Sequence, residues 1–428
     1  MTRAETRAET RAEPIPALPG IDSTAAFLRE GYGFVSGRCR RLGSDRFRTR
    51  MMLRPVTCLC GAEAAREFYR PGRMTRRGAM PATVVALLQD KGSVQALDGA
   101  AHRVRKAMFL DLMTARRLDA ARRIFAGEWT AAADGWQGRT VALRDAVDDI
   151  MTRTALRWCG IAAPDREVAA RRAELSAMVG AAGSIGPAHL RARLLRERSE
   201  RWARGVIRHA RQAGAVGATA DAGVVARLAL HVDADGSRMT EAAAAVELLN
   251  ILRPILAAGR YVVFAAHALH VHRETIPFAA PDAEAMHRAF AQEVRRLYPF
   301  FPVIGGRVLQ PFDWRGAHFD AGDWLLLDLY GTNRDPATWP APETFRPERH
   351  LGADAAPEAL VPQGGGDPVD GHRCPGEDLT VALTTEAIAR LRTMTWQVPE
   401  QDLSLPRNRF PPWPRDGMRI SVAAAGGA

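Results

Sequence analysis

The stretch Gly371-His372-Arg373-Cys374-Pro375-Gly376-Glu377 places one cysteine in a glycine- and proline-rich loop. Asp378 and Leu379 follow directly and begin a stretch whose apolar residues recur with helical spacing. Backbone N–H groups and the positive end of a helix dipole stabilise a thiolate at such a place. The sequence therefore predicts a stabilised thiolate at Cys374, and the alternative is an ordinary loop cysteine.

The other cysteines offer Cys374 no partner. The chain has 5 cysteines, with no Cys-x-x-Cys pair and no even set: Cys39, Cys58, Cys60, Cys159 and Cys374. Such usage is typical of a reducing cytosol, and we interpret Cys58 and Cys60 as structural. A lone sulfur cannot build a zinc or iron–sulfur site, but one sulfur suffices as the axial ligand of a haem-thiolate protein.

Composition is that of a globular protein. The 428 residues are 47% hydrophobic and 25% charged, with no Ser/Gly/Pro linker, so we expect one large domain over residues 20–423. Residues 2–13 repeat Thr-Arg-Ala-Glu, and we expect a disordered charged tail over residues 1–19. No apolar run is expected to reach the roughly 18–20 residues of a membrane span. With no signal-peptide core, this predicts a soluble, cytoplasmic protein.

The net charge of +11 raises the alternative of nucleic-acid binding. Arginines are frequent over residues 191–211, but they alternate with glutamates, and no pattern of aromatic residues for base stacking accompanies them. We favour solvated helix faces and expect no nucleic-acid partner.

Helical periodicity covers most of the chain, which predicts a mainly α fold with a small β region. The predicted helices are residues 62–70, 80–89, 99–112, 115–135, 140–160, 165–182, 187–213, 240–272, 282–298 and 377–393. Strands are expected within 319–329 and 418–422, and a hairpin within 302–315.

The predicted helix over 240–272 would be about 48 Å long and would run through the middle of the molecule. Thr240 can cap it, and Arg253-Pro254 stands at its centre. A proline there removes one backbone hydrogen bond, and a buried guanidinium needs an anionic partner because it cannot lose its proton. The alternatives are that Pro254 ends the helix and that Arg253 pairs with a protein carboxylate.

Four separated segments together resemble the cytochrome P450 superfamily. Glu293-Val294-Arg295-Arg296 resembles its Glu-x-x-Arg pair, Phe345–Arg349 the segment whose arginine joins that pair, and Asn333–Pro336 the connection before it. Cys374 then falls where the haem ligand belongs. The resemblance implies the P450 fold and haem b, with Cys374 as the metal ligand.

Two departures narrow the resemblance. Asp367 and Asp370 replace the usual phenylalanine and glycine of the haem loop, and Arg253-Pro254 replaces the usual acid–alcohol pair. Both departures resemble the bacterial fatty-acid peroxygenases, as does the segment Gly92–Gly99 followed by His102. That family implies hydroxylation of long-chain fatty acids at Cα or Cβ by hydrogen peroxide, without an obligatory redox partner or membrane insertion.

The resemblance also implies roles for the residues of the site. Arg253 would bind the substrate carboxylate, which then serves as the acid–base for peroxide, and Pro254 would open the local backbone. Gln95 would favour hydroxylation over decarboxylation, because glutamine has no proton to exchange at neutral pH, so decarboxylation would be minor.

Further residues complete the expected site. Arg76, His102, Lys106 and His372 are candidates for binding the haem propionates, and the alternative is solvent-exposed charges. Leu87, Leu88, Phe300 and Phe301 are candidates for the acyl channel, and the alternative is core packing.

Two other haem-protein functions remain open at this point. One is a P450 monooxygenase that depends on a redox partner, against which Arg253 argues. The other is a non-catalytic haem-thiolate sensor, although no output module is evident.

Overall fold

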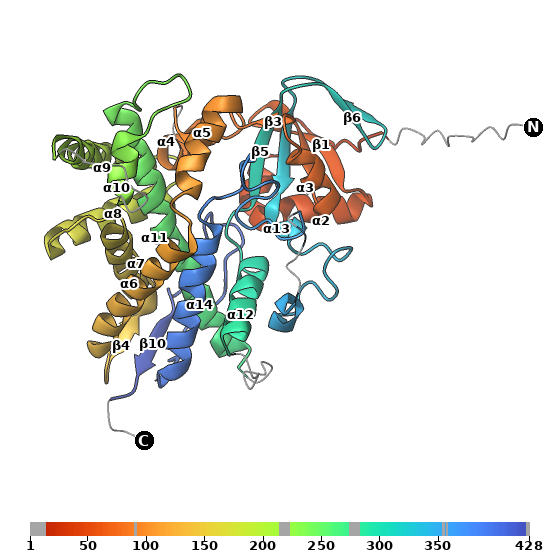
Figure 1. The fold of residues 1–428 in the computed structure, drawn as a ribbon. Helices are drawn as coiled ribbons and strands as arrows, with labels where there is room; N and C mark the ends of the chain where they lie inside the picture. Colours follow the sequence, from red (N-terminus) through yellow and green to blue (C-terminus); the bar gives the residue numbers. More distant parts are fainter. Residues whose placement is uncertain are drawn as a thin grey trace, which may run out of the picture.

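The structure is a computed structural model that describes residues 14–89, 92–213, 223–273, 283–352, 356 and 358–424. Most of the predicted charged tail lies outside these residues. Helices fill one side of the molecule and the main sheet stands at the other (Figure 1). This is the predicted mainly α architecture with a small β region.

All ten predicted helices are present with nearly the predicted bounds. They are α3 (Ala62–Phe68), α4 (Ala82–Leu88), α5 (Gly99–Leu110), α6 (Ala115–Asp134), α7 (Leu143–Trp158), α8 (Asp165–Gly180), α9 (Pro187–Gln212), α11 (Glu241–Val271), α12 (Ala283–Leu297) and α14 (Glu377–Thr393). The prediction missed short elements, which span too few turns to show a period: α1 (Thr24–Glu30), α2 (Phe34–Leu42), α10 (Val224–Leu230), α13 (Leu329–Thr332) and the 3₁₀ turns η1 (Gly31–Gly33), η2 (Val94–Ala96) and η3 (Pro347–His350).

The main sheet has the strand order β1-β2-β8-β5-β3. Its strands are β1 (Arg46–Met51), β2 (Arg54–Leu59), β3 (Met74–Thr75), β5 (Val303–Val308) and β8 (Trp324–Asp328). A smaller sheet joins β4 (Thr140–Ala142), β10 (Arg419–Val422) and β9 (Trp396–Gln397). The predicted helix start at residue 140 is therefore wrong, because residues 140–142 pair with β10.

The hairpin predicted over 302–315 is also wrong. Residues 303–308 form β5, which pairs with β8 on one side and β3 on the other. The hairpin lies further along the chain, between β6 (Phe312–Trp314) and β7 (Ala317–Phe319). Its two-residue turn, Arg315-Gly316, has positive φ at both positions (49° and 72°), as a type I′ hairpin turn requires.

Helix α11 forms the centre of the helical part, in contact with α7, α8, α9, α12 and α14 (Figure 1). The Thr240 hydroxyl caps it by accepting from the Ala243 N–H at 3.1 Å. The helix continues through Pro254, so the alternative that Pro254 ends it is wrong.

The expectation that no apolar run could span a bilayer also needs correction. Among the described residues, α11 alone is long and apolar enough, with a mean hydropathy of 1.4 over 18 residues, yet 78% of that window is buried inside the protein. It is the core helix of a globular fold.

A buried charge cluster fixes the region that carries Cys374. Glu293 on α12 accepts from Arg296 at 2.7 and 2.8 Å, from His350 at 2.8 Å and from the Arg346 backbone N–H at 2.8 Å. Arg349 adds an ion pair at 3.3 Å. The predicted association of the Glu-x-x-Arg pair with the segment Phe345–Arg349 is confirmed, through Arg349.

Candidate active site

The Cys374 loop leads into the N-terminus of α14. The Cys374 N–H donates to the Gln363 carbonyl at 3.3 Å, and the Gln363 side-chain amide lies 3.9 Å from Sγ. Burial raises the pKa of the Cys374 thiol, and a hydrogen bond from the Gly376 backbone opposes that rise. Among the described residues no group of three His, Cys, Asp or Glu side chains could hold a metal ion.

Basic side chains gather beside this loop. Lys106 Nζ donates to the Gly371 carbonyl at 3.1 Å and to the Arg373 carbonyl, and the rings of His102 and His372 are 4.3 Å apart. Burial, followed by the charges of Arg76, His102 and Lys106, lowers the pKa of His372. Within the described part of the chain, none of these four groups forms an ion pair with a carboxylate. The structure therefore brings all four predicted propionate ligands together.

One cavity joins His102, Lys106 and His372 to the centre of α11, while Arg76 is not among its lining residues. The residues that line it include Gln95, His102, Lys106, Phe109, Asn250, Ile251, Pro254, Ile255, His372, Cys374, Leu379 and Leu383. Pro254 is exposed although it lies in the middle of the core helix, because it faces this cavity.

The lining fits haem b. A thiol stands ready as an axial ligand, apolar side chains suit the porphyrin ring, and basic groups without carboxylate partners suit two propionates. Cys374 would ligate the iron, and Arg76, His102, Lys106 and His372 would bind the propionates.

Arg253 lies beside the cavity and is only 3% exposed. Its guanidinium donates to the carbonyls of Leu87 and Leu88 at 3.2 and 2.5 Å and to Asn250 Oδ1 at 2.6 Å. Burial lowers the pKa of Arg253 to about 9, so it stays charged at neutral pH. No carboxylate among the described residues forms an ion pair with it, which is contrary to the alternative that a protein carboxylate is its partner.

Sequence reasoning missed a buried polar cluster around Arg253. Asn250 Nδ2 donates to Glu247 Oε2 at 2.8 Å and to Gln95 Oε1 at 3.3 Å. Glu247 also accepts from Arg105 at 3.0 Å. The available signal was three polar residues at intervals of three along an otherwise apolar helix: Glu247, Asn250 and Arg253.

The predicted acyl-channel residues are not among those that line this cavity. Leu87 is fully buried in the core, Leu88 is partly exposed, and Phe301 is 42% exposed. The Phe300 ring stacks on Tyr261 with centroids 4.5 Å apart. Core packing therefore accounts for Phe300 and Leu87 as the structure stands, and their channel role stays a prediction.

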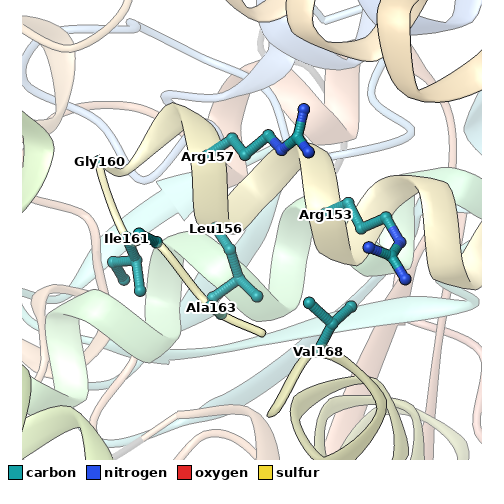
Figure 2. Close-up of a pocket in the computed structure, with 8 residues that line it drawn as sticks. Arg153, Leu156, Arg157, Gly160, Ile161, Ala163 and Val168 are labelled. Carbon is teal, nitrogen blue, oxygen red and sulfur yellow. The ribbon is translucent and has the colours of Figure 1, made fainter. Parts of the chain in front are cut away.

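A second cavity lies between the end of α7 and the start of α8, but its chemistry is different (Figure 2). Its two arginines are already paired, Arg153 with Asp149 and Asp165 at 2.7 and 2.8 Å, and Arg157 with Glu128 at 2.6 Å. With neither a thiol nor an unpaired cation, it does not suit the predicted reaction.

Comparison with known proteins agrees with this geometry. The family model for cytochrome P450 matches residues 282–410. Dimethylnonatriene synthase from Zea mays is 33% identical over 121 residues, which cover 26% of this chain and 22% of that protein. The chain thus matches only about a fifth of the length of such curated relatives.

Solved structures match nearly the whole chain. A variant of cytochrome P450SP alpha (CYP152B1) is 41% identical, covers 95% of this chain and 100% of its own, and has a TM-score of 0.89. This chain belongs to the CYP152 family of cytochromes P450. Cytochrome P450EX alpha (CYP152N1) with myristic acid is 35% identical, covers 96% of this chain and 98% of its own, and has a TM-score of 0.88. A variant of cytochrome P450 OleT with arachidonic acid is 31% identical (96% and 98% covered, TM-score 0.90).

Membership of the CYP152 family confirms three predictions for this protein: the family itself, the P450 fold and haem b as the cofactor.

Proposed function

We propose that this CYP152 protein uses hydrogen peroxide to hydroxylate long-chain fatty acids at Cα or Cβ, with decarboxylation as a minor outcome. Haem b, held by the Cys374 thiolate, supplies the iron chemistry that activates peroxide when it is bound. The observation that carries the proposal is Arg253, a buried cation beside the cavity with no carboxylate partner among the described residues. Neighbours with bound myristic and arachidonic acid support a fatty acid as the partner.

Arg253 binds the substrate carboxylate in this proposal. Its present acceptors are two backbone carbonyls and one amide oxygen, all neutral. A carboxylate is a stronger acceptor, because its negative charge attracts the guanidinium and its two oxygens can accept two parallel hydrogen bonds from it. Fixing the carboxylate there brings the adjacent carbons, Cα and Cβ, into the cavity first, which accounts for the position that reacts.

The substrate carboxylate also moves the proton of peroxide. No Asp or Glu is among the described residues that line the cavity, so the protein presents no acid of its own there. Pro254 occupies the cavity face of α11, where it can donate no backbone hydrogen bond. Gln95 lines the same cavity, and its amide does not titrate at neutral pH, which favours hydroxylation.

Two other functions are less well supported. A monooxygenase that takes electrons from a redox partner would need a proton-delivery group in the protein, and no carboxyl side chain lines the described cavity. A haem-thiolate sensor would not need a buried cation beside the cavity. We further propose that the protein is soluble and cytoplasmic, with no nucleic-acid partner and no stable membrane insertion.

The test is incubation of the haem-loaded protein with myristic acid and hydrogen peroxide, without a redox partner, followed by mass spectrometry. We expect α- and β-hydroxymyristic acids. Arg253→Ala should lose nearly all of this activity, and a short added carboxylic acid should partly restore peroxide-driven oxidation of a substrate that has no acid group. Unchanged activity of Arg253→Ala towards myristic acid would contradict the proposal.

A further inference from the structure

Glu247 is a carboxylate that the proposed function does not use. Its side chain is fully buried on α11, six residues before Arg253. Oε1 accepts from the Val94 N–H at 2.9 Å and from Arg105 at 3.0 Å, and Oε2 accepts from Asn250 at 2.8 Å. Burial raises the pKa of Glu247, while the hydrogen bond from Asn250 and the charge of Arg105 oppose that rise.

Glu247 fixes the orientation of the Asn250 amide. An ionised carboxylate only accepts hydrogen bonds, and a guanidinium only donates them. Asn250 lies between one of each, with Nδ2 towards Glu247 and Oδ1 towards Arg253 at 2.6 Å. Only this orientation satisfies both neighbours. The flipped amide would turn its oxygen towards the Glu247 carboxylate, which is an acceptor, and its nitrogen towards the Arg253 guanidinium, which is a donor.

Asn250 in turn fixes the orientation of Gln95. The Gln95 Oε1 accepts from Asn250 Nδ2 at 3.3 Å and from the Ser93 hydroxyl at 2.6 Å. The amide oxygen is thus occupied, and the Nε2 donor is the part of Gln95 left for the cavity that it lines. Glu247 also binds the backbone of Val94, the residue before Gln95. The buried Glu247 carboxylate therefore fixes the position of the Val94 backbone and, through Asn250, the orientation of the Gln95 side-chain amide.

We propose that Glu247 is a positioning residue that makes the head-group site selective for a carboxylate over a neutral head group. It acts through Asn250 and Gln95. As a result, the substrate head group beside Arg253 meets the Gln95 amide nitrogen, which is a donor, and not the amide oxygen. This inference rests on the proposed function.

Glu247 can be replaced without leaving its partner Arg105 buried with no counter-charge. Arg105 also binds Asp233 through two nitrogens, at 2.6 to 2.9 Å. In Glu247→Gln, Arg105 keeps Asp233 and the carbonyl of Gly92, so the variant is expected to fold. In the new amide the oxygen is needed by the Val94 N–H and Arg105, so the nitrogen faces Asn250 Nδ2, which is also a donor. Asn250 can then no longer satisfy both this amide and Arg253, which releases the constraint on Gln95.

The test is titration of the haem-loaded protein with myristic acid and with its primary amide, followed by haem absorbance. In Glu247→Gln, we expect the Kd for the acid to rise about tenfold, as for loss of an aligned hydrogen bond to a charged group. The Kd for the amide should change little, so the preference for the acid falls by the same factor.

A double-mutant cycle separates positioning from general destabilisation. If Glu247 acts through Asn250, the pair Glu247→Gln/Asn250→Ala should bind the acid about as weakly as Asn250→Ala alone. Glu174→Gln is the matched control, since Glu174 is 1% exposed and binds Arg171 and Ser199 away from the cavity. It should leave both Kd values unchanged.

The outcomes separate the two proposals. Weak binding of the acid by the wild type, or no effect of Arg253→Ala, would overturn the proposed function itself. If Arg253→Ala behaves as expected while Glu247→Gln keeps the wild-type preference for the acid, the role of Glu247 is contradicted. Additive effects in the cycle, or equal weakening of acid and amide binding, would also contradict it.

Discussion

Individual residues of the site differ in how far local sequence reveals them. Cys374 and Arg253 stand in unusual local contexts, a Gly/Pro loop before a helix and a cation before a mid-helix proline. These contexts single out both residues, but the roles predicted for them came from the resemblance to the fatty-acid peroxygenases. Asn250 and Glu247 acquire their roles only from distant partners, Gln95 and Arg105, which folding brings to α11. Such contacts leave no local pattern beyond the polar spacing on the helix.

His267 illustrates how burial controls a titratable residue. Its Nδ1 lies 2.8 Å from the Tyr298 hydroxyl and its Nε2 lies 3.2 Å from the Leu403 carbonyl. A carbonyl can only accept, so Nε2 carries the proton and Nδ1 accepts from Tyr298. The ring is therefore neutral, and burial lowers its pKa to about 4.

This lowered pKa predicts a pH dependence of stability. Between pH 6.5 and pH 4, His267 is protonated in the unfolded state but neutral in the folded state. The free energy of unfolding therefore falls as the pH falls through this window. The loss should reach at most about 3 kcal/mol. Denaturant unfolding of wild type and His267→Gln at pH 7 and pH 4 measures it, and the variant should lose less stability on acidification. An equal loss in both proteins would contradict this role of His267.

At the scale of elements, the long helices were predictable because many turns repeat the same apolar spacing. The errors arose where partners decide the structure. Residues 140–142 become a strand because β10 pairs with them, and residues 303–308 become a strand of the main sheet because β8 and β3 pair with them. Gly305 on β5 also leaves room for the Ala79 carbonyl oxygen, which would lie 2.2 Å from a Cβ at that position. The hydrophobic pattern of the sequence contains no signal for these pairings or for this close approach.

The proline in α11 predicts a trade of stability for function. Pro254 leaves the Asn250 carbonyl without its helical N–H donor, and its side chain is exposed to the cavity, so little packing would be lost on replacement. Pro254→Ala should raise the free energy of unfolding by about 1–3 kcal/mol. Denaturant unfolding of both proteins is the measurement, with product analysis for the expected loss of hydroxylation. Lower stability of the variant would show that Pro254 supports α11.

At the scale of the whole molecule, two charge clusters on α12 join separate parts of the fold. Glu293 binds Arg296, Arg349 and His350. Arg295, the residue before Arg296, binds Glu377 at the start of α14. Burial alone would raise the pKa of Glu293, but the hydrogen bonds from Arg296 and His350 outweigh it and lower that pKa to about 2. This stabilisation is complete above about pH 4.5 and is lost as the pH falls towards 2.

Removing the Glu293 charge should destabilise the whole fold. Glu293→Gln leaves Arg296 buried without its counter-charge, at a cost of about 3–5 kcal/mol. Asp119→Asn is the control, because the side chains of Asp119 and its partner Arg123 are 54% and 69% exposed and such surface pairs contribute less than about 1 kcal/mol. Equal denaturation midpoints for the two variants would show that the Glu293 cluster does not support the fold.

The proposed function depends on where a bound fatty acid places its carboxylate. A crystal structure of the haem-loaded protein with myristic acid would show this position. We expect the carboxylate within hydrogen-bond distance of the Arg253 guanidinium, with Gln95 presenting its amide nitrogen to the same cavity. A carboxylate bound elsewhere, with Arg253 still held only by Leu87, Leu88 and Asn250, would contradict it.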